Sequence, residues 1–243
     1  MSLEEMKILG ISLMGPLLGS LIGVAIRPGE SLLFGMLSFA GGTMLGISFL
    51  QMIPESIMMG GTVGCMLGVS IGVLVMMLAG DFVNGVERGS GKSRAKLETA
   101  SLMMIAAIFI HNFPEGIAMA AGTHMSQGGK AMLIAIAIAT HDIPEGICSS
   151  APYYYSTGKR LRAFLQSAST ALPVIVGFFL GKSIFAYINP YAMGMVMGAV
   201  AGMMIYVSCK ELIPTSQSGK TPKISMTALM MGILFVLLLG NMS

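Results

Sequence analysis

The chain has 243 residues, of which 54% are hydrophobic and 10% charged, and its formal net charge is +3. A soluble domain carries roughly 25% charged residues, so this composition excludes an ordinary soluble globular protein. The lipid bilayer is therefore a predicted partner, and no nucleic-acid partner is predicted.

Apolar segments of about 20 residues, the length of a helix that crosses the hydrocarbon core, recur along the chain. Eight are predicted, at about 6–26, 32–58, 61–79, 99–121, 129–153, 161–184, 191–213 and 224–240. The second and third are joined by little more than MMGGT. The predicted fold is all-α, a single polytopic membrane domain of eight transmembrane helices over 1–243.

Basic residues are distributed unevenly between the two predicted membrane faces. With the N-terminus outside, only Lys7, Lys130 and Lys182 lie on the outer side. The inner side holds the others: Arg27, Arg88, Lys92, Arg94, Lys96, Lys159, Arg160, Arg162, Lys210, Lys220 and Lys223. Because cytoplasmic segments are enriched in Lys and Arg, both termini are predicted to be extracytoplasmic. The expected location is a plasma or inner cell membrane, with 81–98 as a cytoplasmic loop.

The chain also contains an internal echo. Residues 51–56 read QMIPES and close the second predicted helix, while residues 210–216 read KELIPTS and close the seventh. Under the predicted topology these segments lie at opposite membrane faces, as inverted repeats require. The pattern predicts helices 1–3 at 6–80, a central pair at 99–153 and helices 6–8 at 161–241, a 3+2+3 arrangement.

The central pair carries two related hexapeptides, HNFPEG at 111–116 and HDIPEG at 141–146. His111 lies about 12 residues, or about 18 Å, into its helix, and His141 lies about as deep from the opposite face. Two antiparallel helices therefore bring both motifs to the middle of the bilayer. Within each motif the histidine and the glutamate are four residues apart and share a helix face.

Prolines and glycines in the motifs predict a local interruption of both helices. Pro114 and Pro144 each remove a backbone donor, and Gly116 and Gly146 loosen the following turn. Such interruptions are tolerated in a membrane only where they are buried in protein or line a watery cavity.

Three carboxylates in the motifs, Glu115, Asp142 and Glu145, are costly at this depth. Each costs about 2.5–3.5 kcal/mol at the bilayer midplane on insertion scales. No Lys or Arg lies at the same depth, so a divalent cation is the predicted source of compensating charge. Imidazole nitrogen and carboxylate oxygen together suit Zn²⁺, Fe²⁺ or Mn²⁺ better than Ca²⁺ or Cu⁺.

The predicted metal ligands are His111, Asn112, Glu115, His141, Asp142 and Glu145. The two histidines and two glutamates form a nearly tetrahedral first site. Asn112 and Asp142 lie about 100° further round their helices and hold a second ion if the glutamates bridge, which would make the centre binuclear.

Three polar residues at helix ends are candidates for a metal pathway. Gln51 and Glu55 lie near the outer face and Glu211 near the inner face, at echoed positions. Transient metal ligation is one interpretation of them, and ordinary solvated helix ends are the other.

The two hexapeptides, in the fourth and fifth of eight predicted helices, resemble the ZIP (Zrt-, Irt-like) family of divalent-metal transporters. The resemblance implies transport of Zn²⁺, Fe²⁺, Mn²⁺ or Cd²⁺ towards the cytoplasm and a homodimer. It also implies a binuclear centre at the six matching residues. Relatives often have Glu before the proline of the sixth helix, where this chain has Leu172 before Pro173.

Two other functions remain open from the residues alone. An intramembrane zinc metalloprotease would need a helical HExxH motif, whereas here the glutamate is the fourth residue after the histidine. A non-transporting membrane metal sensor would bind the ion tightly without carrying it. The 25 methionines are scattered through every apolar segment and are predicted to be adaptable packing residues.

Overall fold

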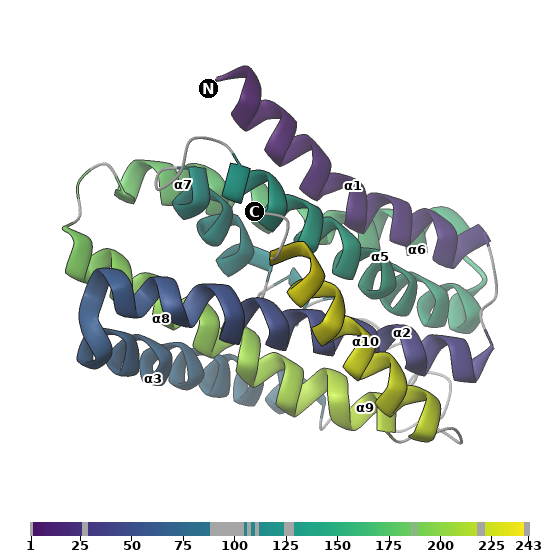
Figure 1. Cartoon of the computed structure of the whole chain (residues 1–243). Helices are drawn as coiled ribbons and strands as arrows, with labels where there is room; N and C mark the ends of the chain where they lie inside the picture. The colour runs from purple at the N-terminus through teal and green to yellow at the C-terminus, as the bar shows by residue number, and fades with distance from the viewer. Residues whose placement is uncertain are drawn as a thin grey trace.

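The structure is a computed structural model that describes residues 2–25, 29–87, 105, 108–109, 112–123, 129–185, 187, 189–217 and 222–240. Throughout these residues the chain forms helices and their connections and contains no strand, which confirms the predicted all-α class. Figure 1 shows the helices packed side by side as an elongated bundle.

The helices, in chain order, are α1 (Leu3–Ala25), α2 (Glu30–Ile47), the π-helix η1 (Ser48–Met52), α3 (Ile53–Glu87), α5 (Gly129–Thr157), α6 (Arg160–Ala168), the 3₁₀-helix η2 (Ser169–Ala171), α7 (Leu172–Phe185), α8 (Pro190–Val207), the π-helix η3 (Ser208–Leu212), α9 (Ile213–Gln217) and α10 (Pro222–Gly240). Residues 112–123, between α3 and α5, are also helical.

Helices of this length and composition belong in a membrane. Four segments of the described chain are long and apolar enough to cross one: Leu3–Ala25, Phe34–Leu78, Arg160–Ile184 and Pro190–Gln217. The second has 45 residues, about twice the length that one crossing needs.

Gly61 divides this 45-residue segment. Its φ of 66° and ψ of 173° form a conformation that glycine adopts readily and other residues rarely do. The chain reverses there, and the two arms lie side by side in Figure 1. Cys65 Sγ, on the far arm, lies 4.0 Å from the carbonyl oxygen of Ile53 on the near arm. The predicted short connection at MMGGT is thus confirmed.

The predicted loop over 81–98 is wrong in its first part. Helix α3 continues to Glu87, so residues 81–87 are helical, and residues 88–98 lie outside the described part of the chain. No proline follows the apolar segment to stop the helix, and its hydrogen bonds can therefore continue beyond it.

The two echoed segments have the same local structure. A five-residue π-helix, η1, precedes Ile53 and Pro54, and a second five-residue π-helix, η3, precedes Ile213 and Pro214. Each begins with a buried serine whose hydroxyl donates to a carbonyl four residues earlier. Because π-helical turns are rare, two of them at matching positions support a structural relation between these segments.

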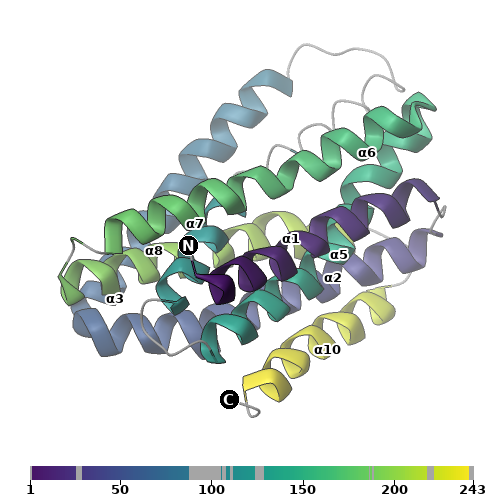
Figure 2. The ribbon, with the colours of Figure 1, turned by 90° about the horizontal axis from the view of Figure 1, so that it is seen from above.

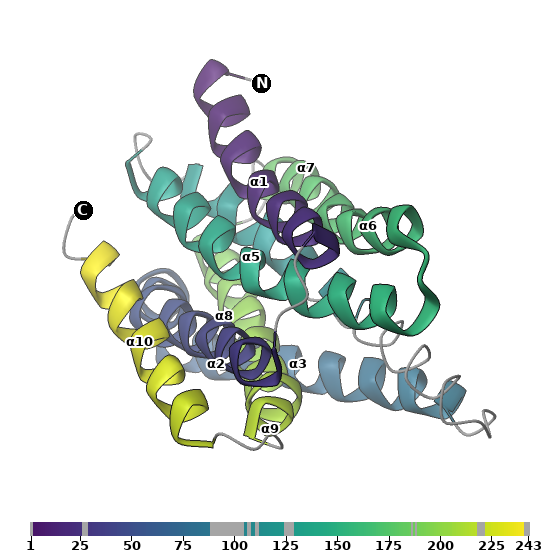
Figure 3. The same ribbon diagram turned by 90° about the vertical axis from the view of Figure 1, so that its right-hand side faces the viewer.

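The helices form two groups. Helix α1 packs along α5 and α6, and residues 112–123 pack on α7, which together form the α5 group. Helix α3 packs along α8, and α2 packs along α10, which together form the α8 group. Figure 3 shows the two groups side by side. In the α5 group, α6, η2 and α7 continue one another as a single rod, visible from above in Figure 2.

Glycines allow very close contact inside each group. A Cβ at Gly15 or Gly19 of α1 would overlap the α5 backbone, and a Cβ at Gly116 would overlap α7. In the α8 group, a Cβ at Gly68 of α3 would overlap α8. Small residues at helix contacts let membrane helices gain dispersion energy through backbone proximity, so each group is tightly joined.

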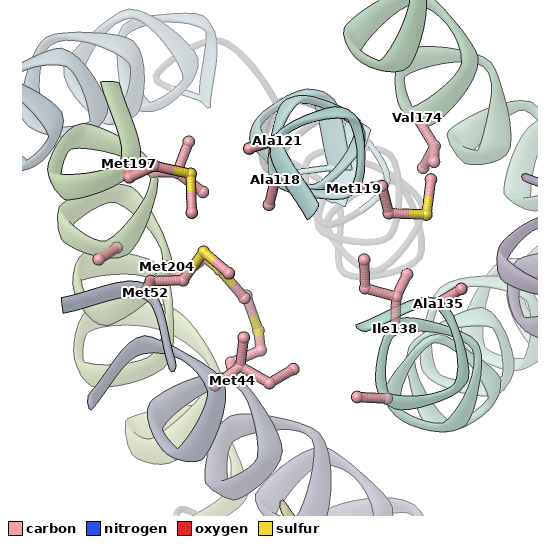
Figure 4. Close-up of a cluster of buried hydrophobic side chains, with 14 of the residues drawn as sticks. Met44, Met52, Ala118, Met119, Ala121, Ala135, Ile138, Val174, Met197 and Met204 are labelled. Carbon is pink, nitrogen blue, oxygen red and sulfur yellow. The ribbon is translucent and has the colours of Figure 1, made fainter. Parts of the chain in front are cut away.

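The boundary between the groups has a different composition. Figure 4 shows methionines Met44, Met52, Met197 and Met204 on the side of the α8 group, opposite Ala118, Ala121 and Ile138 of the α5 group. All seven side chains are buried in one apolar cluster. This is the packing role that the sequence predicts for methionine, whose unbranched chain adapts to irregular space.

Candidate metal centre

Three predicted ligands meet in the interior of the α5 group. Glu115, from the 112–123 helix, and His141 and Asp142, from α5, each offer a donor atom within 4.8 Å of the other two. All three residues are buried, with exposures of 0–1%. His141 Nε2 lies 2.8 Å from Glu115 Oε1 and 3.2 Å from Asp142 Oδ1. Both separations are slightly shorter than the roughly 3.3 Å expected between donor atoms around a tetrahedral zinc ion.

The backbone of α5 fixes the orientation of the imidazole ring. His141 Nδ1 lies 2.9 Å from the carbonyl oxygen of Ala137, one turn earlier. A carbonyl only accepts, so Nδ1 must carry the hydrogen in this bond. Nε2 is then the ring atom left to bind a metal, and a backbone partner on the other nitrogen is typical of metal-ligating histidine.

Several oxygens around this group lack a hydrogen-bond donor among the described residues. They are Glu115 Oε2, Asn112 Oδ1 and both carboxylate oxygens of Asp142, and all are buried. Leaving a buried acceptor without a partner is costly. The carboxylate oxygens of Glu115 and Asp142, which lie beside an imidazole nitrogen, therefore fit a divalent cation that would satisfy them.

Asn112 reaches the same region from the 112–123 helix and is held by the rod of α6, η2 and α7. Its Nδ2 donates to the carbonyl oxygen of Thr170 at 2.7 Å. Thr170 lies in η2, and its own hydroxyl donates to the carbonyl of Ser167. With the nitrogen of the amide engaged in this way, its oxygen is the free end.

A buried hydroxyl network extends from Ser167 to α1 and α5. Ser167 Oγ lies 2.7 Å from Ser20 Oγ and 2.5 Å from Ser149 Oγ. The hydroxyl oxygens of Ser149, Ser150 and Ser167 all lie 2.7–3.2 Å from the carbonyl oxygen of Gly146. Gly146 follows Glu145 directly, so the network ties the end of the HDIPEG motif to its neighbouring helices.

Sequence reasoning missed this network and the role of Thr170. From sequence alone, a serine on an apolar helix is predicted to be a small packing residue. Only the packing of α1, α5 and α6 brings these hydroxyls together. The motif STALP does contain Thr170 and the proline that follows the 3₁₀ turn. It gives no sign that a backbone carbonyl there holds Asn112.

The structure agrees with the predictions for some of the other site residues and not for others. Glu145 is buried one turn beyond His141 on α5, as its spacing requires. His111 lies outside the described residues. Asp142, which the sequence assigned to a second ion, lies against His141 and Glu115 in the same buried group. Leu172 is 54% exposed, so the side chain at this position does not point into the buried group.

The expected interruption of the second motif is smaller than predicted. Helix α5 runs without a break from Gly129 to Thr157, through Pro144. One proline removes a single hydrogen bond, and the turns on either side continue the helix. The close contact of Gly146 with Gly19 and Ser20 of α1 supports α5 at this point.

The predicted pathway residues belong to helices other than those that carry the buried group. Gln51 belongs to η1 and Glu211 to η3, the two equivalent π-helices, and Glu55 follows η1 in the first turn of α3. Gln51 Oε1 is buried and accepts no hydrogen bond from a described residue, whereas Glu211 is exposed.

A family profile described as ZIP Zinc transporter matches residues 84–240. A protein named Zinc transporter ZupT from Chlorobium luteolum is 30% identical over 237 residues, covering 89% of this chain and 89% of the relative. Proteins of the same name are 35% identical in Corynebacterium efficiens and 34% in Escherichia coli O127:H6, covering 82% of this chain and 82% and 81% of those relatives.

These matches agree with the two hexapeptides and with the buried group that they form. The chain therefore belongs to the ZIP family of zinc transporters, which are membrane transporters and not enzymes.

Proposed function

We propose that this protein carries divalent transition-metal ions, with Zn²⁺ as the principal substrate and Fe²⁺, Mn²⁺ or Cd²⁺ as further ones, across the membrane into the cytoplasm. The observation that carries the proposal is the buried group of Glu115, His141 and Asp142, in which three of the four carboxylate oxygens lack a hydrogen-bond donor among the described residues. Family membership supports the metal and removes the protease alternative.

His111, Glu115, His141 and Glu145 are the proposed ligands of the first ion. Asn112 and Asp142, with the two glutamates as bridges, are the proposed ligands of a second. Two features favour this assignment for the described residues. Asn112 turns its amide nitrogen to Thr170, and His141 turns Nδ1 to Ala137, which leaves a donor atom of each for metal.

Alternating access is the proposed mechanism, with the α5 group moving as a unit against the α8 group. Close glycine contacts join the helices of each group, whereas methionine and alanine side chains line the boundary between them. Flexible thioether side chains repack at low cost when surfaces shift. Gln51 and Glu55 would meet the ion on the outer side and Glu211 on the inner side.

The proposed topology keeps eight crossings with both termini outside the cytoplasm. The start of α1 and the end of α10 lie towards the same end of the bundle in Figures 1 and 2. At that end Lys182 Nζ of α7 donates to Glu5 Oε1 of α1 at 2.6 Å. Both residues belong to the outer side under the proposed orientation.

Zinc uptake into proteoliposomes tests the function. The purified protein is expected to give saturable Zn²⁺ uptake above empty vesicles, and His141→Ala is expected to reduce it to the level of the empty vesicles. Equal flux through wild type and variant would refute transport through this site. Zinc binding without flux by the wild-type protein would instead indicate a metal sensor. Competition by Fe²⁺, Mn²⁺ and Cd²⁺ in the same assay ranks the substrates.

Acid is expected to weaken zinc binding. Histidine must be neutral and carboxylates ionised to ligate a metal, so zinc affinity should fall as pH decreases from about 7 to 5. Calorimetric zinc titrations of the detergent-solubilised protein at half-unit pH steps measure this. A flat affinity profile over the interval would contradict mixed histidine and carboxylate ligation.

A further inference from the structure

A basic groove lies at the start of the rod formed by α6, η2 and α7, away from the metal centre. It has a volume of about 510 Å³ and is lined by Lys159, Arg160, Leu161, Arg162, Leu165 and Gln166. We propose that this groove binds the headgroup of an anionic phospholipid. The inference does not depend on metal transport.

The charge of the groove is uncompensated. Lys159, Arg160 and Arg162 are exposed, and within the described chain none of them forms an ion pair with an acidic side chain. The N-terminal cap position of α6 is Lys159, which makes no side-chain capping bond. The positive end of the α6 dipole therefore adds to the charge of the three side chains. A phosphate diester is the complementary group.

The apolar part of the groove indicates a lipid rather than a free anion. Leu161 and Leu165 are 70% and 56% exposed, and they share a face of α6 because they are four residues apart. A free phosphate would leave both side chains uncovered. A phospholipid would place its phosphate against the basic residues and its glycerol and first methylenes against the leucines.

The groove also lies at the depth in the membrane where lipid headgroups are found. Arg160 is the first residue of Arg160–Ile184, one of the segments apolar enough to cross a membrane. Its guanidinium group, with Lys159 and Arg162 beside it, therefore belongs at the boundary between hydrocarbon and water. Basic pockets at this level attract anionic headgroups. A lipid bound there would hold one end of the rod. Further along the rod, Ser167 and Thr170 form hydrogen bonds with Gly146 and Asn112 of the two motifs.

Lipid selectivity of the full-length protein tests the proposal. Spin-labelled phosphatidylglycerol and spin-labelled phosphatidylcholine are added to the protein in phosphatidylcholine membranes, and the motionally restricted fraction is measured by electron spin resonance. The wild-type protein is expected to favour phosphatidylglycerol. Arg160→Gln with Arg162→Gln should lower this preference by about fivefold for each arginine removed. Lys210→Gln with Lys223→Gln removes the same charge from other exposed positions and should retain it.

Three results would overturn the proposal. Equal restriction of the two lipids by the wild-type protein would do so without any variant. Equal losses in the two double variants would show a diffuse surface charge instead of a site. Displacement of phosphatidylglycerol by inorganic phosphate, beyond a chloride control of equal ionic strength, would assign the groove to the free anion. Zinc binding by each variant, measured separately, verifies that the protein is folded.

Discussion

Replacing Glu115 with glutamine is expected to abolish the stabilisation of the protein by zinc. Glu115 is fully buried, and its Oε1 lies 2.8 Å from His141 Nε2. Glutamine keeps the size and the hydrogen-bonding oxygen but removes the charge that the proposed site offers to the cation. Loss of a residue that merely orients a ligand typically costs about 10–100-fold in metal affinity, so loss of a ligand should cost at least as much.

Thermal unfolding with and without zinc measures this effect. At a zinc concentration about 100 times the dissociation constant, wild-type protein should gain about 2.7 kcal/mol of stability from binding. The Glu115→Gln protein should gain little at the same concentration. Glu5→Gln makes the same chemical change at a residue paired with Lys182, far along the chain, and should keep the full zinc effect. An undiminished zinc effect in Glu115→Gln would exclude this carboxylate as a ligand.

Replacing Gly19 with leucine is expected to separate α1 from α5 and to destabilise the protein strongly. A Cβ at this position would overlap the carbonyl oxygen of Ile143, which is backbone and cannot rotate away. Overpacking typically costs about 1–3 kcal/mol even where side chains can adjust, which corresponds to about 2–12 °C in the unfolding midpoint for a chain of this size. A clash with backbone should reach the upper part of this range.

The same helix provides a matched control. A Cβ at Gly10 of α1 would meet nothing within 4 Å, so Gly10→Leu should leave the midpoint almost unchanged. Circular dichroism of both variants without zinc measures the midpoints. Because α5 carries His141 and Asp142, Gly19→Leu should also weaken zinc binding. Equal midpoints for the two variants would show that α1 and α5 are not held by this close contact.

The contrast between glycine contacts and methionine contacts bears on how such a protein can move. Helix pairs joined through backbone contact cannot separate without losing many dispersion contacts at once. The buried methionines between the groups have three rotatable bonds each and can exchange partners. A protein that needs two rigid parts and a sliding boundary would therefore place its small and its flexible residues as this chain does.

Local sequence was sufficient for much of the fold, and it named the three residues that meet in the buried group. The apolar segments identified helices suited to a membrane, and MMGGT identified the reversal at Gly61. The HDIPEG motif placed His141 and Glu145 on one face of a single helix, since the spacing of four residues is a property of the helix itself. The echo at 51–56 and 210–216 matched two π-helices in the structure, although no periodicity rule predicts the π form.

Tertiary packing determined which side chains from different helices meet, which residue spacing along one helix cannot determine. The sequence alone does not determine how α5 is rotated against the 112–123 helix, and this rotation brings Asp142 to the same group as His141 and Glu115. The packing of the rod formed by α6, η2 and α7 places the carbonyl of Thr170 where it accepts a hydrogen bond from Asn112. The same packing leaves the side chain of Leu172 exposed. The amino-acid sequence predicted that the buried charge needs a cation, because the residue types and their place in the apolar segments set the cost of burying them. Only the arrangement of several helices around one point decided which oxygens would meet it, because that choice depends on contacts between residues far apart in the chain.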